Sequence, residues 1–357
     1  MARQYCGRLG KTDNCQIVVT LSIANHAASL PIAYRLYLPE DWAADEARRK
    51  KTHVPDAVKF RTKPEIALDQ IRAALAAGVA PGGFADRRRF GINGAFRFGV
   101  TALGLTYAMG VQPTLSVWPP DAGPLPPKPW SGRERKPSLV RRDADHRPVS
   151  AKRLAIASAP EDWRTVVGRE GSNEALSSRF TAVRIRPASR DWQGSTPHPL
   201  EWLLVEWPDG EKEPTKCWLS TLSEAAPIEV LVDTAKLRRR IERDYEELKS
   251  ELGFAHFEGR SWHGFHHHAT LCIAAYGFLI RGRAAIPPCD PRRRETSRLL
   301  MRPKPRGAAD PTRATRRKLD RYSATAALSR TGPKPLALPV SPSHATTAAL
   351  PRVIVTQ

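Results

Sequence analysis

The chain has 357 residues and a formal net charge of +21, from 57 Lys and Arg residues against 36 Asp and Glu. This length allows two modest domains, or one domain with an insertion and a tail. The positive charge predicts a polyanionic partner, and nucleic acid is the first candidate. The longest apolar run, residues 269–280, is too short to cross a bilayer, and the five cysteines have no CxxC spacing. These patterns argue against a membrane protein, a zinc ribbon and a disulfide scaffold, and they predict a cytoplasmic protein.

The first third of the chain is predicted to mix strands with helices. Runs of β-branched and alternating residues predict strands, and apolar residues at helical spacing predict helices. The expected strands are 15–23, 31–38, 103–111 and 114–118, and the expected helices are 39–51 and 64–77. The first two strands are close enough in sequence to form a hairpin. This order of elements predicts an α/β fold.

The last two thirds of the chain are predicted to hold a linker, a β-rich block, two helices and a tail. Residues 119–142 are rich in Pro, Gly and basic residues, which predicts a loop or linker. Further strands are expected at 180–185, 200–207 and 216–222, and helices at 237–252 and 264–280. From residue 281 onward, Lys and Arg far outnumber Asp and Glu, and apolar periodicity is absent. That composition predicts a disordered basic tail.

The helix expected at 237–252 carries one acidic residue within a basic cluster. Its apolar residues recur at helical spacing and form one stripe: Leu237, Ile241, Tyr245, Leu248 and Leu252. Arg238, Glu242 and Lys249 lie along the edge of that stripe, since residues four and seven apart share a helix face. Two interpretations stay open, a site for metal and phosphate or a surface helix with Arg–Glu and Glu–Lys pairs.

A histidine cluster precedes the apolar part of the helix expected at 264–280. His263 and His267 have the i, i+4 spacing of zinc ligands on a helix, with His266 and His268 beside them. An HExxH pattern is absent, and so is a nearby Cys that would complete a ligand set. The alternative interpretation is that these side chains pack at the start of the apolar helix.

Two long blocks resemble bacterial insertion-sequence DDE transposases. They are ARQYCGRLGKTDNCQIVVTLSIANHAASLPIAYRLYLPEDWAAD near the N-terminus, and WLLVEWPDGEKEPTKCWLSTL followed by the two predicted C-terminal helices. The resemblance covers residues 2–280 and implies an RNase H-like mixed sheet with a β-rich insertion before the last catalytic helix. It implies four parts: 1–118, the N-terminal part of the core with its first strand missing; 119–226, linker and insertion; 227–283, the C-terminal catalytic helices; and 284–357, the disordered basic tail.

The resemblance also assigns roles to residues. Glu242 takes the place of the third catalytic acid, and Arg238 and Lys249 take the Arg and Lys places of the family's helix signature. The Tyr place of this signature falls on Ala235, which is a departure. With Arg239 and Arg240, Arg238 and Lys249 are the expected DNA-binding residues.

The other two acids of the family triad are the difficulty. The second-acid place falls on Arg87, and Asp86, one residue before it, is the candidate for that acid and for a metal ligand beside Glu242. The segment that carries the first acid in the family is not found before ARQYCG. The resemblance therefore implies a truncated copy.

The implied chemistry is DNA cleavage and strand transfer assisted by Mg²⁺ or Mn²⁺, because three carboxylates hold two divalent ions at such sites. The expected partners are transposon ends and target DNA, with a second copy of the chain as a possible partner, in the cytoplasm at the bacterial nucleoid. We expect an insertion-sequence transposase with impaired catalysis. The alternatives are a non-catalytic DNA-binding remnant, a product without function, and an unrelated metal hydrolase that uses the histidines.

Overall fold

A mixed β-sheet forms the centre of the structure. The computed structural model describes residues 2–6, 9–25, 28–86, 88–133, 135–170, 175–285 and 352–356. The sheet and its covering helices belong to a compact unit made of Met1–Arg281 and Ala349–Gln357. In the other unit, Gly282–Ala348, only residues 282–285 are described, and they are the last turn of a helix.

The N-terminal half of the sheet contains the hairpin and the two strands that carry the site. Its strands are β3 (Val18–Ala24), β4 (Ser29–Leu36), β5 (Phe84–Asp86), β6 (Tyr107–Val111) and, from the other end of the chain, β13 (Arg352–Thr356). Strands β3 and β4 pair antiparallel from Val18↔Leu36 to Ala24↔Ser29, which confirms the predicted hairpin. Strands β5 and β6 pair in parallel.

The β-rich block extends this same sheet. Its strands are β7 (Ser116–Trp118), β8 (Val149–Ser150), β9 (Arg164–Glu170), β10 (Ala175–Pro187), β11 (Glu201–Trp207) and β12 (Lys216–Ser220). The strand order is β4-β3-β13-β5-β6-β12-β11-β10-β7-β8, and β9 also pairs with β10. The antiparallel pairing of β6 with β12 joins the insertion to the core strands. The predicted mixed α/β fold is confirmed, and most of its strand pairs are antiparallel.

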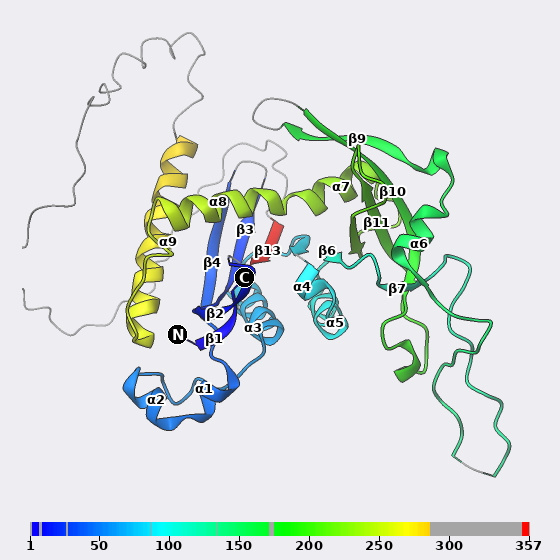
Figure 1. Cartoon of the computed structure of the whole chain (residues 1–357), viewed down its shortest axis with the longest axis horizontal. Helices are drawn as coiled ribbons and strands as arrows, with labels where there is room; N and C mark the ends of the chain where they lie inside the picture. The colour runs from blue at the N-terminus through cyan, green and yellow to red at the C-terminus, as the bar shows by residue number, and fades with distance from the viewer. Residues whose placement is uncertain are drawn as a thin grey trace, which may run out of the picture. The chain divides into compact units, whose positions relative to one another are not determined.

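Strand β13 lies where the resemblance implies the first strand of the core. It pairs antiparallel with β3 over Arg352↔Ala24 to Thr356↔Thr20, and in parallel with β5 at Ile354↔Ala85. Figure 1 shows β13, in red, beside β3. Strand β13 therefore covers the edge of β3 that the absence of a first core strand would leave open. Of the segment predicted to be a disordered tail, residues 284–285 end a helix and 352–356 form this strand, while 286–351 and 357 lie outside the described residues.

Helices cover both faces of the core strands. On one face lie α3 (Lys63–Ala76) and α5 (Gly94–Ala102), and on the other α8 (Arg238–Ser250) and α9 (Trp262–Ala285). Helix α7 (Ile228–Lys236) packs on the insertion strands through Leu231, Val232 and Ala235. The start of α3 follows from its sequence, since Pro64 stands in the first turn and the Glu65 carboxylate accepts a hydrogen bond of 2.7 Å from the Thr62 backbone N–H.

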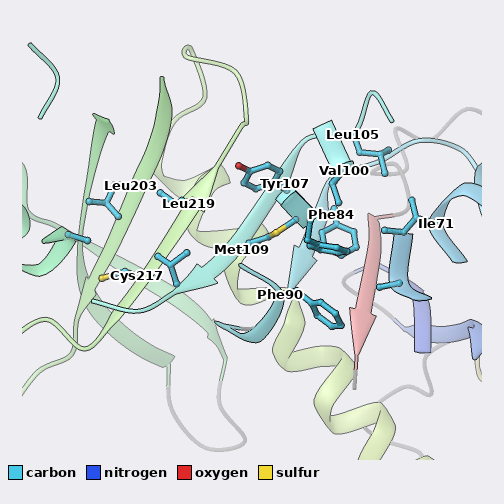
Figure 2. Packing of buried hydrophobic residues seen from close by; sticks show 14 of the residues in the cluster. Ile71, Phe84, Phe90, Val100, Leu105, Tyr107, Met109, Leu203, Cys217 and Leu219 are labelled. Carbon is cyan, nitrogen blue, oxygen red and sulfur yellow. The ribbon is translucent and has the colours of Figure 1, made fainter. Parts of the chain in front are cut away.

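The main core lies between the sheet and the α3–α5 face. It joins strand residues of the core to those of the insertion, so that Phe84, Met109 and Leu219 belong to one buried cluster (Figure 2). The remaining elements are short: β1 (Ala2–Cys6) paired with β2 (Lys11–Cys15), α1 (Glu40–Ala44), α2 (Glu46–Lys51), α4 (Arg88–Gly91) and α6 (Ala151–Ile156). No helix in the described part of the chain has the length and apolar character needed to cross a membrane.

Candidate active site

Asp86 and Glu242 come together through a single arginine. Asp86 is the last residue of β5 and its side chain is 2% exposed, whereas Arg238 and Glu242 lie one turn apart on α8. The Arg238 Nη1 donates to Asp86 Oδ1 at 3.0 Å, and its Nε donates to Glu242 Oε1 at 3.0 Å. The structure therefore places three of the predicted site residues in one ion-pair network.

The neighbouring elements fix this network in place. Ala85, the residue before Asp86, packs in the same buried cluster as Leu237 and Ile241 of the α7–α8 segment. Two residues after Glu242 on α8, Asp244 is 4% exposed. Its carboxylate accepts hydrogen bonds from Ser29 N at 2.9 Å and Ser29 Oγ at 2.7 Å, at the start of β4. Helix α8 is thus fixed to β4 by Asp244 and to β5 by Arg238.

The segment after Asp86 is held close to β6 by a glycine. A Cβ added at Gly91 would lie 2.1 Å from the Gly110 carbonyl oxygen, so only glycine permits this approach. The Gly91 carbonyl also accepts a hydrogen bond of 2.5 Å from Arg97 Nη1. Arg87, on which the second-acid place falls in the resemblance, lies outside the described residues.

The other predicted DNA-binding residues differ in their surroundings. Arg240 donates to Asp244 at 3.2 Å, four residues along α8, and is 24% exposed. Lys249 is exposed, and its ammonium lies 5.8 Å from the centre of the Tyr245 ring. The side chain of Arg239 lies outside the described part of the structure. Of these three residues, Lys249 is the one described as exposed.

The described residues do not fit the paired-metal arrangement that the resemblance implies. Within the described part of the chain, no group of three or more His, Cys, Asp or Glu side chains is placed to hold a metal ion. The sequence of β13, RVIVT, has no acid in the strand position from which the family supplies its first carboxylate. The acids that are present, Asp86 and Glu242, share the guanidinium of Arg238, so a cation of the protein already neutralises part of their charge.

Two of the four clustered histidines, His266 and His268, pack against neighbouring residues, whereas His263 and His267 are exposed. The His266 ring stacks on Tyr34 and lies against Trp262, and its Nδ1 is 2.8 Å from the Trp262 carbonyl oxygen. Burial lowers the pKa of His266. His268 Nε2 lies 2.9 Å from the Gly253 carbonyl oxygen in the connection from α8 to α9. These contacts favour the packing interpretation for His266 and His268, and among the described residues His263 and His267 belong to no group of three or more possible metal ligands.

Two buried charge clusters beside the site were missed in the sequence. Glu206, 4% exposed, accepts from Lys236 Nζ at 2.5 Å and lies 3.3 Å from Lys216 Nζ. Burial acts to raise the pKa of Glu206, but its hydrogen bond to Lys236 and the charges of both lysines lower the pKa below its ordinary value. The residues come from three different elements, so their spacing in sequence gave no signal.

The second cluster joins Glu201, Tyr107 and Arg97, which are 2%, 1% and 0% exposed. Burial raises the pKa of Glu201, although the Arg97 charge and a hydrogen bond with Tyr107 act to lower it. Burial and the charge of Glu201 raise the pKa of Tyr107. Its three residues come from α5, β6 and β11, so their spacing in sequence gave no signal either.

Residues 1–175, just under half of the chain, match the family described as DDE superfamily endonuclease. The resemblance to a DDE transposase-like endonuclease is confirmed. The family acts on DNA and generally uses divalent metal ions. The match ends before α8, and no curated protein matches the chain.

Proposed function

We propose that this chain is a transposase-type protein of an insertion sequence that binds DNA but is impaired in metal-dependent cleavage and strand transfer. The observation that carries this proposal is the position of Arg238, which bridges the two candidate acids at 3.0 Å each. In a two-metal site, three carboxylates face the metal ions and clamp the attacking and leaving oxygens. Here, a guanidinium occupies the contact between the two described acids.

Electrostatics favours the arginine over a metal ion at this position. Arg238 and Asp86 are 13% and 2% exposed, so that separating them would leave a buried carboxylate without its cation. Two carboxylates also supply fewer ligands than the six oxygens that Mg²⁺ or Mn²⁺ requires, and the remainder would have to come from water and DNA phosphate. We therefore propose that Asp86 and Glu242 stand at the family's metal-ligand positions but no longer bind metal ions.

DNA is the proposed partner because of the charge of the chain and because residues 1–175 match a DNA endonuclease family. The formal net charge of +21 favours association with any polyanion. On α8, Lys249 and Arg243 are exposed, whereas Arg238 and Arg240 are ion-paired with carboxylates. We assign the DNA phosphate contacts to these two exposed residues. A second copy of the chain is also a proposed partner, bound to the same DNA.

Two measurements on the full chain test this function. Fluorescence anisotropy with a labelled duplex, titrated with salt, should give an affinity that falls steeply with salt concentration. Lys249→Ala should reduce the slope of log affinity against log salt by about 1. Lys216→Ala, which changes a charge on the insertion strand β12, is the matched control and should leave the slope unchanged. No change with Lys249→Ala would contradict its assignment to DNA phosphate.

Cleavage distinguishes the impaired transposase from an active enzyme. The full chain should not nick labelled terminal-repeat DNA in Mg²⁺ or Mn²⁺ above the level of the Glu242→Gln variant. Glu246→Gln, a change at an exposed acid one turn further along α8, controls for the loss of a charge. Metal-dependent cleavage that disappears in Glu242→Gln and persists in Glu246→Gln would contradict the impairment. Salt-dependent binding to duplexes of any sequence, without preference for transposon ends, would favour a non-catalytic DNA-binding remnant.

A further inference from the structure

We propose that β3 and β5 form a binding site for an extended peptide strand at the centre of the sheet, and that the C-terminal segment Arg352–Thr356 is its ligand. The segment pairs with β3 at five positions and with β5 at one. It is antiparallel to the first strand and parallel to the second, so its backbone is hydrogen-bonded on both sides. A strand that is inserted in this way recognises its neighbours chiefly through the main chain.

The site is buried on both faces of the sheet, apolar toward α3 and α5 and partly polar toward α8, where the buried Ser22 hydroxyl donates to Tyr245 Oη at 3.5 Å. In β3, Val19 and Leu21 are fully buried against the α3–α5 face, and in β5 Phe84 belongs to the same cluster. Ala24 and Ala85 belong to the cluster on the α8–α9 face. An empty site would leave backbone N–H and C=O groups of β3 and β5 without partners in a region from which water is excluded, which is costly. This cost provides the driving force for binding a strand.

The ligand has the composition that such a site requires. Arg352–Thr356 reads RVIVT, with three consecutive β-branched apolar residues and no proline. Strands that are buried on both faces are typically continuous apolar runs of this kind. The residues before it, 341–351, include Pro342 and Pro351, and a proline cannot donate to a ladder in a central strand. The register is therefore limited on its N-terminal side.

The segment is also joined to the rest of the unit by a long connection. Residues 286–351 separate it in sequence from the end of α9. A connection of this length raises the local concentration of the strand only to a modest level, and a free peptide of the same sequence can compete at accessible concentrations. The site is thus a receptor for a strand, which the chain supplies from its own C-terminus.

Hydrogen exchange on the full chain tests the proposal. In the wild type, the amides of β3 should exchange slowly. Ile354→Pro removes the N–H at the centre of the inserted strand and should raise exchange in β3 and β5 at least tenfold. Ala348→Pro, outside the strand, is the matched control and should have no effect. A synthetic peptide, PRVIVTQ, added to Ile354→Pro should restore the protection, whereas PRVPVTQ should not.

A cross-link decides the result if Ile354→Pro unfolds the whole chain. Directly paired positions in an antiparallel ladder bring their Cβ atoms to about 5 Å. The paired variant Ser22→Cys with Ile354→Cys should form an intramolecular disulfide under mild oxidation, detected by peptide mass mapping, and Ser22→Cys with Val353→Cys should not. Absence of the first cross-link would overturn the proposal, as would equal exchange of β3 in wild type and Ile354→Pro. Cross-linking without rescue by the free peptide in a folded Ile354→Pro variant would overturn the claim that the site is a receptor.

Discussion

Arg238 of α8 and Asp86 of β5, 152 positions apart in sequence, form a hydrogen-bonded ion pair of 3.0 Å in which the carboxylate is almost wholly buried. The same arginine holds Glu242, which is more exposed, on its other side. The pair fixes the helix to the strand and occupies the position at which the resemblance expects metal ligands. The ion pair thus stabilises the fold and is also the structural basis of the proposed impairment of catalysis.

Removal of Arg238 should destabilise the fold. Arg238→Ala leaves Asp86 buried without its cation, and we expect the free energy of unfolding to fall by about 3 kcal/mol in urea titrations. Arg243→Ala, at an exposed position of the same helix, should change it by less than about 0.5 kcal/mol. Combining Arg238→Met with Asp86→Asn should recover part of the loss, because no buried charge is then left unpaired. Equal effects of the two single arginine variants would refute the assignment.

Asp244 should be as important for stability as the arginine. Asp244→Ala removes the acceptor for Ser29 N and Oγ and for Arg240, and it leaves a buried backbone N–H without a partner. We expect the free energy of unfolding to fall by about 2 kcal/mol or more. Glu246→Ala is the control and should have little effect. If amide exchange in α8 were the same in both variants, Asp244 would not be the anchor of the helix.

Lys236 and Lys216, which both pair with Glu206, should contribute unequally to the free energy of unfolding. Lys236 is 21% exposed and 2.5 Å from the carboxylate, whereas Lys216 is 48% exposed and 3.3 Å away. Lys236→Met should lower the free energy of unfolding at pH 7 by about 2 kcal/mol, and Lys216→Met by less than about 1 kcal/mol.

The lowered pKa of Glu206 gives this prediction a pH dependence. A lowered pKa in the folded state stabilises the protein above the ordinary pKa of 4.5, and that stabilisation is lost as the pH falls through the folded-state pKa. The protonation of Glu206 below pH 4.5 should therefore cost less stability in Lys236→Met than in the wild type. An unchanged acid profile would argue against the pairing.

Glu201 should give stability a pH dependence opposite to that of Glu206. Its pKa is raised by burial, so its contribution to stability is present below the ordinary pKa of 4.5 and is lost as the pH rises through the folded-state pKa. Urea titrations from pH 4.5 to 7.5 should show the wild type losing stability relative to Glu201→Gln as the pH rises. Glu211→Gln, at an exposed position in the turn before β12, should run parallel to the wild type. Parallel curves for Glu201→Gln would mean that the buried group does not titrate in this range.

Local patterns were sufficient for much of the fold. The predicted hairpin is β3–β4, and the helices at 64–77 and 237–252 are α3 and α8. The strand predicted at 180–185 lies within β10, while those at 200–207 and 216–222 match β11 and β12 to within one or two residues. Each has an apolar periodicity that its own residues establish. The spacing of Arg238 and Glu242 likewise predicted their contact on one helix, since residues four apart share a face.

What was not predicted depends on contacts between distant segments. The strands β1 (ARQYC) and β2 (KTDNC) are too polar for a strand pattern, and β13 is five residues long in a segment dominated by basic residues and proline. Its place in the sheet comes from the vacancy between β3 and β5, which no local pattern encodes. The pairing of Arg238 with Asp86 has the same origin, because it requires the sheet and the helix to be packed together first.

Binding of Mn²⁺ to the purified full chain, followed by electron paramagnetic resonance, tests the central claim most directly because it needs no DNA and no activity. With Arg238 bridging Asp86 and Glu242, we predict no bound Mn²⁺ in the wild type beyond that in the Glu242→Gln variant at submillimolar metal. One or two Mn²⁺ ions per chain in the wild type, lost in Glu242→Gln and retained in Glu246→Gln, would contradict the account.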